Sequence, residues 1–292
     1  MGIKLWVMLL MMVLSLLKGL YCFGCWEEER VALLHLKANM NFPDGRSLPS
    51  WVVNKIGTDC CQWKGVECSN TTKRVIKINL DYAKDWKLGD WYFNASLFLP
   101  FQELRNLSLR GNHLVGWIEN EGFDKLSKLR NLEALDLSAN SFDRKILSSL
   151  SQLSSLKHLR IEFNSLERDN DSNGRERLFG LTKLEVLDLS YNGWFSDNDS
   201  ISMLNLNDFI NLRELDLSGN KLRSLGTIYG LKNLKVLNLQ SNYFNNSIFS
   251  SLHGLSSLKS LDLSRNELKG TIQMKDLHAL NLIIRKRNKT AW

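Results

Sequence analysis

Residues 184–192 read LEVLDLSYN, and nearly the same nine-residue pattern returns along the chain. Leucine or isoleucine stands at its first, fourth and sixth positions and asparagine at its ninth. The pattern occurs seven times, with its asparagines at Asn112, Asn140, Asn164, Asn192, Asn220, Asn242 and Asn266. A degenerate earlier copy has Val75, Ile78 and Leu80, but Ala83 in place of the asparagine. The asparagines are 22 to 28 residues apart, a period that is typical of solenoid proteins.

The leucines at the fourth and sixth positions alternate along a short strand and therefore point to the same side. One repeat cannot bury that side alone, so neighbouring repeats must stack into a continuous core. The asparagine follows the strand, where its amide can pair with backbone groups that would otherwise be buried without partners. We predict an α/β repeat fold, a right-handed solenoid of horseshoe shape whose parallel strands line the concave side. Second apolar sets between the strands are predicted to fill the convex wall, for example Phe123, Leu126 and Leu129, or Leu147, Leu150 and Leu153.

The first 24 residues differ from the rest of the chain. One positive charge at Lys4 precedes an apolar run from Leu5 to Leu17, and small residues stand at Cys22 and Gly24. Thirteen apolar residues are too few to span a bilayer, which needs about 20. We therefore predict a signal peptide over residues 1–24, cleaved after Gly24, and hence an extracellular protein. No later stretch predicts a membrane span.

Four cysteines remain after this cleavage, all within 44 residues: Cys25, Cys60, Cys61 and Cys68. In a secreted chain this density predicts two disulfides. A zinc site is the alternative, but adjacent cysteines are poor ligand spacing and no histidine pair lies nearby. Three pairings are open from the residues alone.

Charge and motifs exclude other classes. The formal charge is +7, but four of the positive residues are in the tail from Arg285 to Lys289, so the repeats themselves have no basic face for nucleic acid. The five histidines are scattered over different positions of the repeat, and no nucleophile, zinc-protease or phosphate-binding motif is present. We expect no enzyme activity, no metal and no cofactor.

Residues 25–74 lack the repeat and are predicted to form an N-terminal cap that covers the first coil. The three glutamates Glu27–Glu29 suit a helix N-terminus. Val31 and Leu34, with Leu33 and Leu36, are predicted to form the buried face of this helix. Trp51 and Trp63 are predicted to cover the first repeat.

The segments CWEEERVALLHLKANM, SLPSW, DCCQWKGVEC and KRVIKINL of this cap, with LSANSF, LSGNKL and LSRNELKGTI in the repeats, resemble plant leucine-rich-repeat receptor-like proteins over about residues 25–275. The resemblance implies that Cys25 pairs with Cys60 and Cys61 with Cys68. It also implies a cell-surface protein without a kinase domain that binds an extracellular peptide, protein or glycan and signals through a partner receptor kinase.

The chain departs from this family towards its end, where the pattern decays after Ile272. We expect repeats over residues 75–272, a degenerate basic tail over residues 273–292, and a truncated or alternatively spliced product. A secreted inhibitor similar to plant polygalacturonase inhibitors is one alternative, although those proteins carry a C-terminal disulfide cap and no cysteine follows Cys68 here. A decoy fragment is the other alternative.

Binding residues are expected among the side chains that flank the inner leucines of each strand. Aspartate and serine recur there, at Asp136, Asp188, Asp216 and Asp262 for example, and are interpreted as a solvated repeat filler. His158, Arg160 and Glu162 interrupt this filler and are the preferred ligand contacts, and Asn238 and Gln240 are further candidates. Seven acceptor sequences for N-glycosylation begin at Asn70, Asn94, Asn106, Asn170, Asn198, Asn245 and Asn288. A glycan on Asn106 would project from the concave face and obstruct a ligand there.

Overall fold

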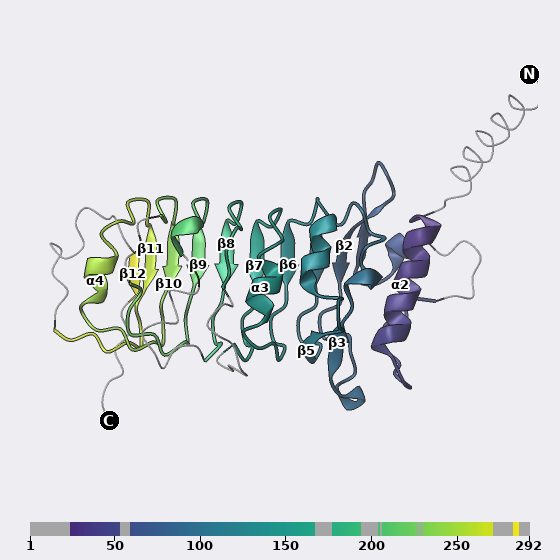
Figure 1. Ribbon diagram of the computed structural model, residues 1–292, viewed down its shortest axis with the longest axis horizontal. Coiled ribbons are helices and arrows are strands. Elements are labelled where there is room, and N and C mark those ends of the chain that lie inside the picture. Colours follow the sequence, from purple (N-terminus) through teal and green to yellow (C-terminus); the bar gives the residue numbers. More distant parts are fainter. Residues whose placement is uncertain are drawn as a thin grey trace, which may run out of the picture.

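The computed structural model describes residues 24–52, 59–166, 177–193, 204, 206–226, 228 and 230–270, and the backbone of a strand at residues 283–285. Most of the predicted signal peptide, and the glycosylation sites Asn170, Asn198 and Asn288, lie outside these residues. The described chain forms an elongated stack of coils, with the cap at one end (Figure 1).

One ten-stranded sheet runs the length of the stack in the order β1-β2-β4-β6-β7-β8-β9-β10-β11-β12. All neighbouring strands are parallel except β1 and β2. Each parallel step pairs the central leucine or isoleucine of one strand with that of the next, as Leu159 does with Leu187. The strands are β1 (Val66–Cys68), β2 (Val75–Asn79), β4 (Asn106–Ser108), β6 (Ala134–Asp136), β7 (His158–Arg160), β8 (Val186–Asp188), β9 (Glu214–Asp216), β10 (Val236–Asn238), β11 (Ser260–Asp262) and β12 (Ile283–Arg285).

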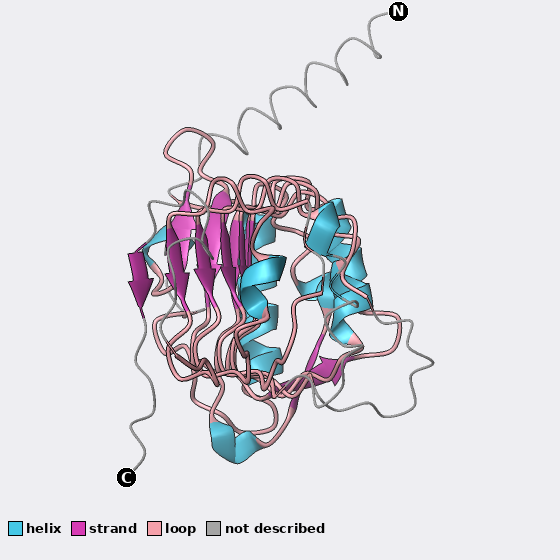
Figure 2. Ribbon diagram, turned by 90° about the vertical axis from the view of Figure 1, so that its left-hand side faces the viewer, coloured by secondary structure: helices cyan, strands magenta, loops and turns pink. Residues whose placement is uncertain are grey.

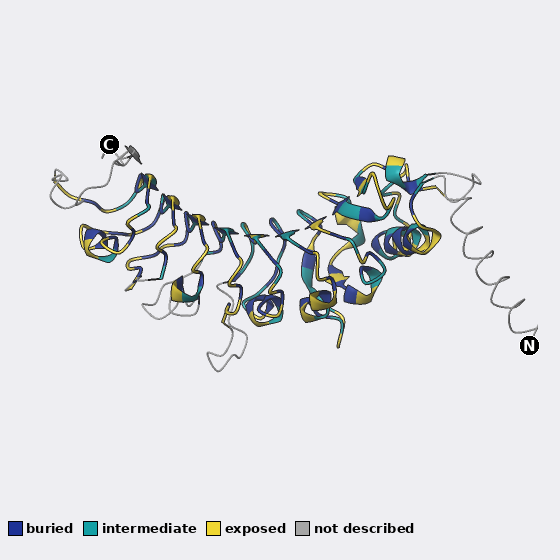
Figure 3. Ribbon diagram, turned by 90° about the horizontal axis from the view of Figure 1, so that it is seen from above, coloured by how far each residue is buried: buried dark blue, intermediate teal, exposed yellow. Residues whose placement is uncertain are grey.

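The strands line the inner side of a curved solenoid and short helical segments line its outer side (Figures 2 and 3). The predicted convex residues, such as Phe123, Leu150 and Leu153, are buried there, which confirms this part of the sequence analysis. The outer elements are η2 (Trp86–Leu88), β3 (Trp91–Phe93), η3 (Ala95–Leu97), β5 (Leu114–Trp117), η4 (Phe123–Lys128), α3 (Ile146–Leu150), η6 (Leu206–Asp208) and α4 (Ile248–Ser251), and β3 and β5 form a small parallel sheet.

The repeat asparagines form the predicted ladder. The Nδ2 group of Asn192 donates to the carbonyl of Ile161 in the preceding coil and to that of Leu189 in its own coil, at 3.0 and 2.9 Å. Its Oδ1 accepts the backbone N–H of Asn164 at 3.1 Å. Equivalent bonds link Asn220 to Asn192 and Asn242 to Asn220. The ladder satisfies backbone groups at the turns that carry a repeat asparagine, which confirms the role predicted for these residues.

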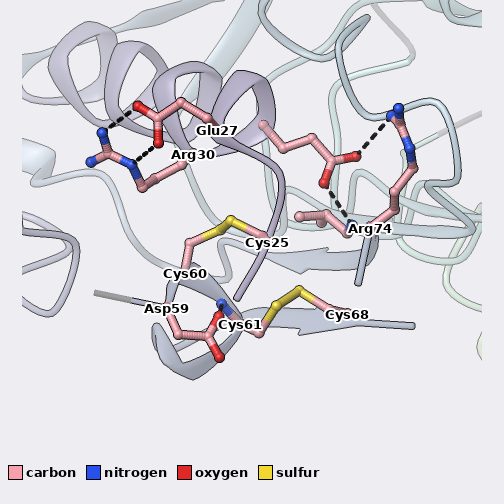
Figure 4. The surroundings of a disulfide bond; sticks show 10 residues. Cys25, Glu27, Arg30, Asp59, Cys60, Cys61, Cys68 and Arg74 are labelled. Carbon is pink, nitrogen blue, oxygen red and sulfur yellow. Dashed lines mark hydrogen bonds and ion pairs between the residues drawn. A yellow bond between two sulfur atoms is a disulfide. The ribbon is translucent and has the colours of Figure 1, made fainter. Parts of the chain in front are cut away.

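The cap contains the helix α2 (Glu27–Met40), the short helix η1 (Cys60–Gln62) and β1, which pairs antiparallel with β2 of the first coil to form a hairpin. Disulfides join Cys25 to Cys60 and Cys61 to Cys68, the pairs that the family resemblance implies (Figure 4). Trp51 and Trp63 are buried and stack with their ring centroids 5.7 Å apart. These contacts tie the segments of the cap to one another.

The buried face of α2 differs from the predicted one. Val31 is 38% exposed, so the prediction for this residue was wrong, whereas Leu34 is half-buried and packs against the core. The buried residues are Glu29, Ala32, Leu33, Leu36 and Met40, which follow the i, i+3, i+4, i+7 spacing of one helix face. The reason is Glu29, whose buried carboxylate accepts the backbone N–H of Val75 at 3.0 Å and lies 3.5 Å from the Arg74 guanidinium.

The strand β12 lies inside the segment that was predicted to be a degenerate tail. Ile284 pairs with Leu261, so the sheet gains a parallel strand there. The leucine pattern could not indicate this strand, because only one of its three inner positions is apolar. Parallel pairing uses backbone donors and acceptors that every residue except proline carries.

Candidate ligand-binding surface

The strand register places the outward side chains in rows along the concave face. His158 lies in the first row, between Ala134 and Val186 of the neighbouring strands. Arg160 lies in the second row, between Asp136 and Asp188. Neighbouring strands are about 4.8 Å apart. Each outward side chain is therefore within reach of its neighbours in the same row.

The recurring aspartates have a structural role. The Oδ1 of Asp188 accepts the N–H of Ser190 at 3.0 Å, and Asp136, Asp216 and Asp262 accept from Ser138, Ser218 and Ser264 in the same way. These serines are buried, although we expected them to face the concave surface. The side chain of a serine is short enough to lie beneath the aspartate turn. The recurring aspartates and serines therefore form turns that end the strands. The sequence had predicted only a row of solvated side chains at these positions.

Strand β7 departs from this arrangement. His158 and Arg160 are both exposed. Arg160 takes part in none of the ion pairs among the described residues, despite an aspartate in each neighbouring strand. Its guanidinium therefore remains available to a ligand. Glu162 is different, because its carboxylate binds the guanidinium of Arg110.

The other two predicted contacts are less available. Asn238 replaces the aspartate of its repeat and performs the same turn, accepting the N–H of Gln240 at 3.1 Å. Its Nδ2 donates to Asp216 at 2.7 Å. Gln240 is half-buried. The structure does not bring these two residues together with His158, because β8 and β9 lie between β7 and β10.

Sequence reasoning missed the residue that precedes the asparagine in each repeat. These residues adopt positive φ and form a row along the edge where the strands end, for example Ala139, Phe163 and Tyr191, and Tyr82 has the same position in the degenerate first repeat. The rings of Phe163 and Tyr191 stack with centroids 4.5 Å apart, and both are exposed. Aromatic residues at consecutive copies of one variable repeat position were the signal that could have indicated this rim.

Two charged groups on this face are perturbed by their surroundings. Burial raises the pKa of Asp188 to about 6, and the nearby carboxylates of Asp216 and Glu162 add to this effect. Hydrogen bonds to Tyr82 and Glu162 raise the pKa of Arg110. The pKa values of these two groups therefore depend on contacts between different coils.

The glycosylation sites that the structure describes lie towards both ends of the stack. Asn70 is exposed in the turn between β1 and β2, Asn94 precedes η3, Asn106 is exposed on β4, and Asn245 is exposed before α4. The strands from β6 to β11 carry no acceptor asparagine. His158 and Arg160 therefore lie on a stretch of sheet that bears no predicted glycan.

Two further properties concern only the described residues. None of their helices combines the length and the apolarity that crossing a membrane requires. Nor do their histidine, cysteine, aspartate and glutamate side chains gather in threes with the geometry of a metal site.

Comparisons with known proteins agree with the fold. The family model of the leucine-rich-repeat N-terminal domain matches residues 27–69. Leucine-rich-repeat models match residues 131–153, 180–199 and 210–268.

The curated relatives are plant proteins. Cuscuta receptor 1 of Solanum lycopersicum is 37% identical over 264 residues, which cover 87% of this chain and 21% of that protein. Receptor-like protein 13 of Arabidopsis thaliana is 35% identical over 283 residues, covering 93% of this chain and 24% of the relative. The chain thus spans under a quarter of the length of these relatives.

Among solved structures, the ectodomain of the Arabidopsis thaliana membrane receptor kinase GASSHO1/SCHENGEN3, in complex with CASPARIAN STRIP INTEGRITY FACTOR 2, has a TM-score of 0.57 and 26% identity. The match covers 88% of this chain and 30% of that one. The family models, the relatives and the stacked coils agree. The chain therefore belongs to the leucine-rich-repeat family of plant receptor-like proteins and corresponds to a part of their length.

Proposed function

We propose that the chain is an extracellular recognition module whose concave face binds a peptide or protein ligand around β7, and that it acts through a partner receptor kinase. The observation that carries the proposal is the contrast between β7 and its neighbours. On β6, β8, β9 and β11 the second outward residue is an aspartate that closes a turn. On β7 that position carries Arg160, which is exposed and has no such role.

The surroundings of Arg160 suggest the chemistry of the ligand. The cation Arg160 lies between the anions Asp136 and Asp188 of the two neighbouring strands, and the exposed His158 lies on the same strand. A ligand can therefore meet positive and negative groups close together. The stacked rings of Phe163 and Tyr191 supply apolar area at the adjacent rim. Aromatic and arginine side chains of this kind dominate the energy of protein interfaces. A polypeptide offers the mixed polar and apolar groups that such a surface binds.

The relatives support the receptor role. They are named as a receptor and as receptor-like proteins, and the GASSHO1/SCHENGEN3 ectodomain was solved with a factor bound. A partner kinase is proposed for this chain because the family resemblance implies one. The predicted divisions, with a signal peptide over 1–24, a cap over 25–74, repeats over 75–272 and a tail over 273–292, belong to the same proposal.

The test uses the secreted chain as bait in plant extracellular fluid, with mass spectrometry of what it retains. One variant replaces His158, Arg160 and Glu162 by alanine. A matched control replaces Lys259, Ser260 and Arg265 of the β11 coil. We expect the β7 variant to retain at least tenfold less of a ligand that the wild type and the control both retain. Equal retention by all three would refute the site, and inhibition of a polygalacturonase by the wild type would favour the inhibitor alternative.

A further inference from the structure

A groove of about 770 Å³ lies at the junction of the cap and the first coil. Its lining includes the turn at residues 48–50, residues 64–67 at the start of β1, and Lys77 and Asn79 of β2. Its volume is within the range of small-ligand sites. Neither the repeat pattern nor the candidate surface around β7 accounts for it.

The groove is rigidly built. The indole N–H of Trp51 donates to the carbonyl of Lys64 at 3.0 Å, and the N–H of Lys64 donates to the Ser50 hydroxyl at 3.3 Å. Gly65 has φ +86° and lies so close to β2 that a Cβ there would be 2.2 Å from the carbonyl oxygen of Asn79. These contacts hold both segments in place around the groove.

The lining combines polar groups with one aromatic ring. Lys77 and Glu67 form an ion pair at 2.6 Å, and Asn79 donates to Asp81 at 3.2 Å. Tyr82 is 64% exposed, and its hydroxyl accepts the Nε–H of Arg110 at 3.0 Å, which fixes the ring at one end of the groove. Donors and acceptors beside an exposed aromatic face suit a sugar, which has hydroxyl edges and apolar ring faces.

Asn106 is directly beside this groove. It is the acceptor of an Asn-Leu-Ser sequence, it is exposed at the first outward position of β4, and it pairs in register with Lys77. Its amide makes none of the hydrogen bonds found among the described residues, whereas those of Asn94 and Asn245 accept backbone N–H groups. Adjacent strands are about 4.8 Å apart. A sugar on Asn106 of β4 is therefore attached one strand away from Lys77 of β2, which lines the groove.

We propose that the groove seats the first sugars of an N-linked glycan on Asn106. The glycan turns across Lys77 towards the cap and away from β6 and β7. A glycan on the concave face then leaves the surface around Arg160 open, which removes the obstruction expected from the sequence. This inference requires that the chain enters the secretory pathway, but it does not depend on any ligand at β7.

The experiment measures the release of glycans by an endoglycosidase from the native protein secreted by eukaryotic cells, followed site by site by glycopeptide mass spectrometry. Asn70, in the exposed turn of the cap hairpin, is the internal control. We expect release from Asn106 to be at least tenfold slower than from Asn70 in the native protein, and equal after denaturation. Equal native rates, or an Asn106 that is unmodified while Asn70 is modified, would overturn the proposal.

Two variants separate seating in the groove from general crowding on the concave face. Lys64→Trp narrows the groove, and Tyr82→Ala removes the ring beside it. Both are expected to raise the Asn106 release rate towards that of Asn70. Lys235→Trp places the same bulk at an exposed position before β10, outside the groove lining, and is expected to leave the rate unchanged. Slow release that survives both groove variants in a folded protein would refute seating, whatever the outcome of the ligand experiment.

Discussion

Arg110 and Glu162 form an ion pair that crosses a complete coil, since one follows β4, the other follows β7, and β6 lies between them. Serine occupies the position between them, at Ser138, and it is buried. The pair therefore links coils that are not neighbours in the stack. Both side chains remain partly exposed, at 30% and 19%, so water screens the attraction.

The first prediction concerns the strength of this link. In a double-mutant cycle of Arg110→Ala and Glu162→Ala, we expect a coupling free energy below about 1 kcal/mol, because partly exposed pairs gain little. Urea denaturation followed by circular dichroism measures it. The exposed pair of Lys157 and Glu133 provides the comparison and should couple still more weakly. A coupling above about 2 kcal/mol would show that the crossing pair is a structural clamp.

The second prediction concerns the asparagine ladder. Asn220→Ala leaves the N–H of Asn192 and the carbonyls of Leu189 and Leu217 without their side-chain partner. Each unsatisfied buried group costs about 1–3 kcal/mol, so we expect a loss of about 2–4 kcal/mol in unfolding free energy. Asn211→Ala is the matched control, because Asn211 donates only to the exposed carbonyl of Thr182. Losses of similar size in both variants would contradict the structural role of the ladder.

The third prediction concerns the aromatic rim. A Cβ at Gly219, where φ is +69°, would lie 2.6 Å from the ring of Tyr191, whereas one at Gly226, where φ is +61°, would meet nothing within 4 Å. Both alanine variants carry backbone strain of about 1 kcal/mol, and Gly219→Ala carries the ring contact in addition. We expect the melting temperature to fall further for Gly219→Ala. The excess should disappear in a Tyr191→Ala background, and an excess that persists would contradict the close packing.

The fourth prediction concerns pH. Burial raises the pKa of Glu29 to about 7, above its ordinary value of 4.5. The unfolded chain therefore loses this proton before the folded one does, and stability falls as pH rises from about 4.5 to 7, by on the order of 3 kcal/mol. Thermal unfolding across this range should show the slope, and Glu29→Gln should reduce it to the part that Asp188, whose pKa is also raised, contributes. Glu28→Gln, on the exposed side of α2, should retain the slope. An unchanged slope in Glu29→Gln would show that another group titrates.

The leucines and asparagines of the repeat were enough to predict the solenoid, the inner strands and the ladder. Their period alone determines which side chains must pack or hydrogen-bond between neighbouring coils. The convex sets followed from the same reasoning. The buried face of α2 could not be predicted in this way, because a glutamate is normally expected to be exposed. Glu29 is buried because Val75 and Arg74, which are distant in sequence, supply partners for its carboxylate.

The candidate surface shows the same division. The sequence singled out His158 and Arg160, because they interrupt a repeated filler. Only the tertiary structure showed that Arg110, from two coils away, binds Glu162, that Phe163 and Tyr191 stack, and that Asn106 lies beside a groove of the cap. Residues within one repeat are related by a local period that the sequence displays. Residues in different coils are related by the register of the sheet, which is fixed only when the strands pair.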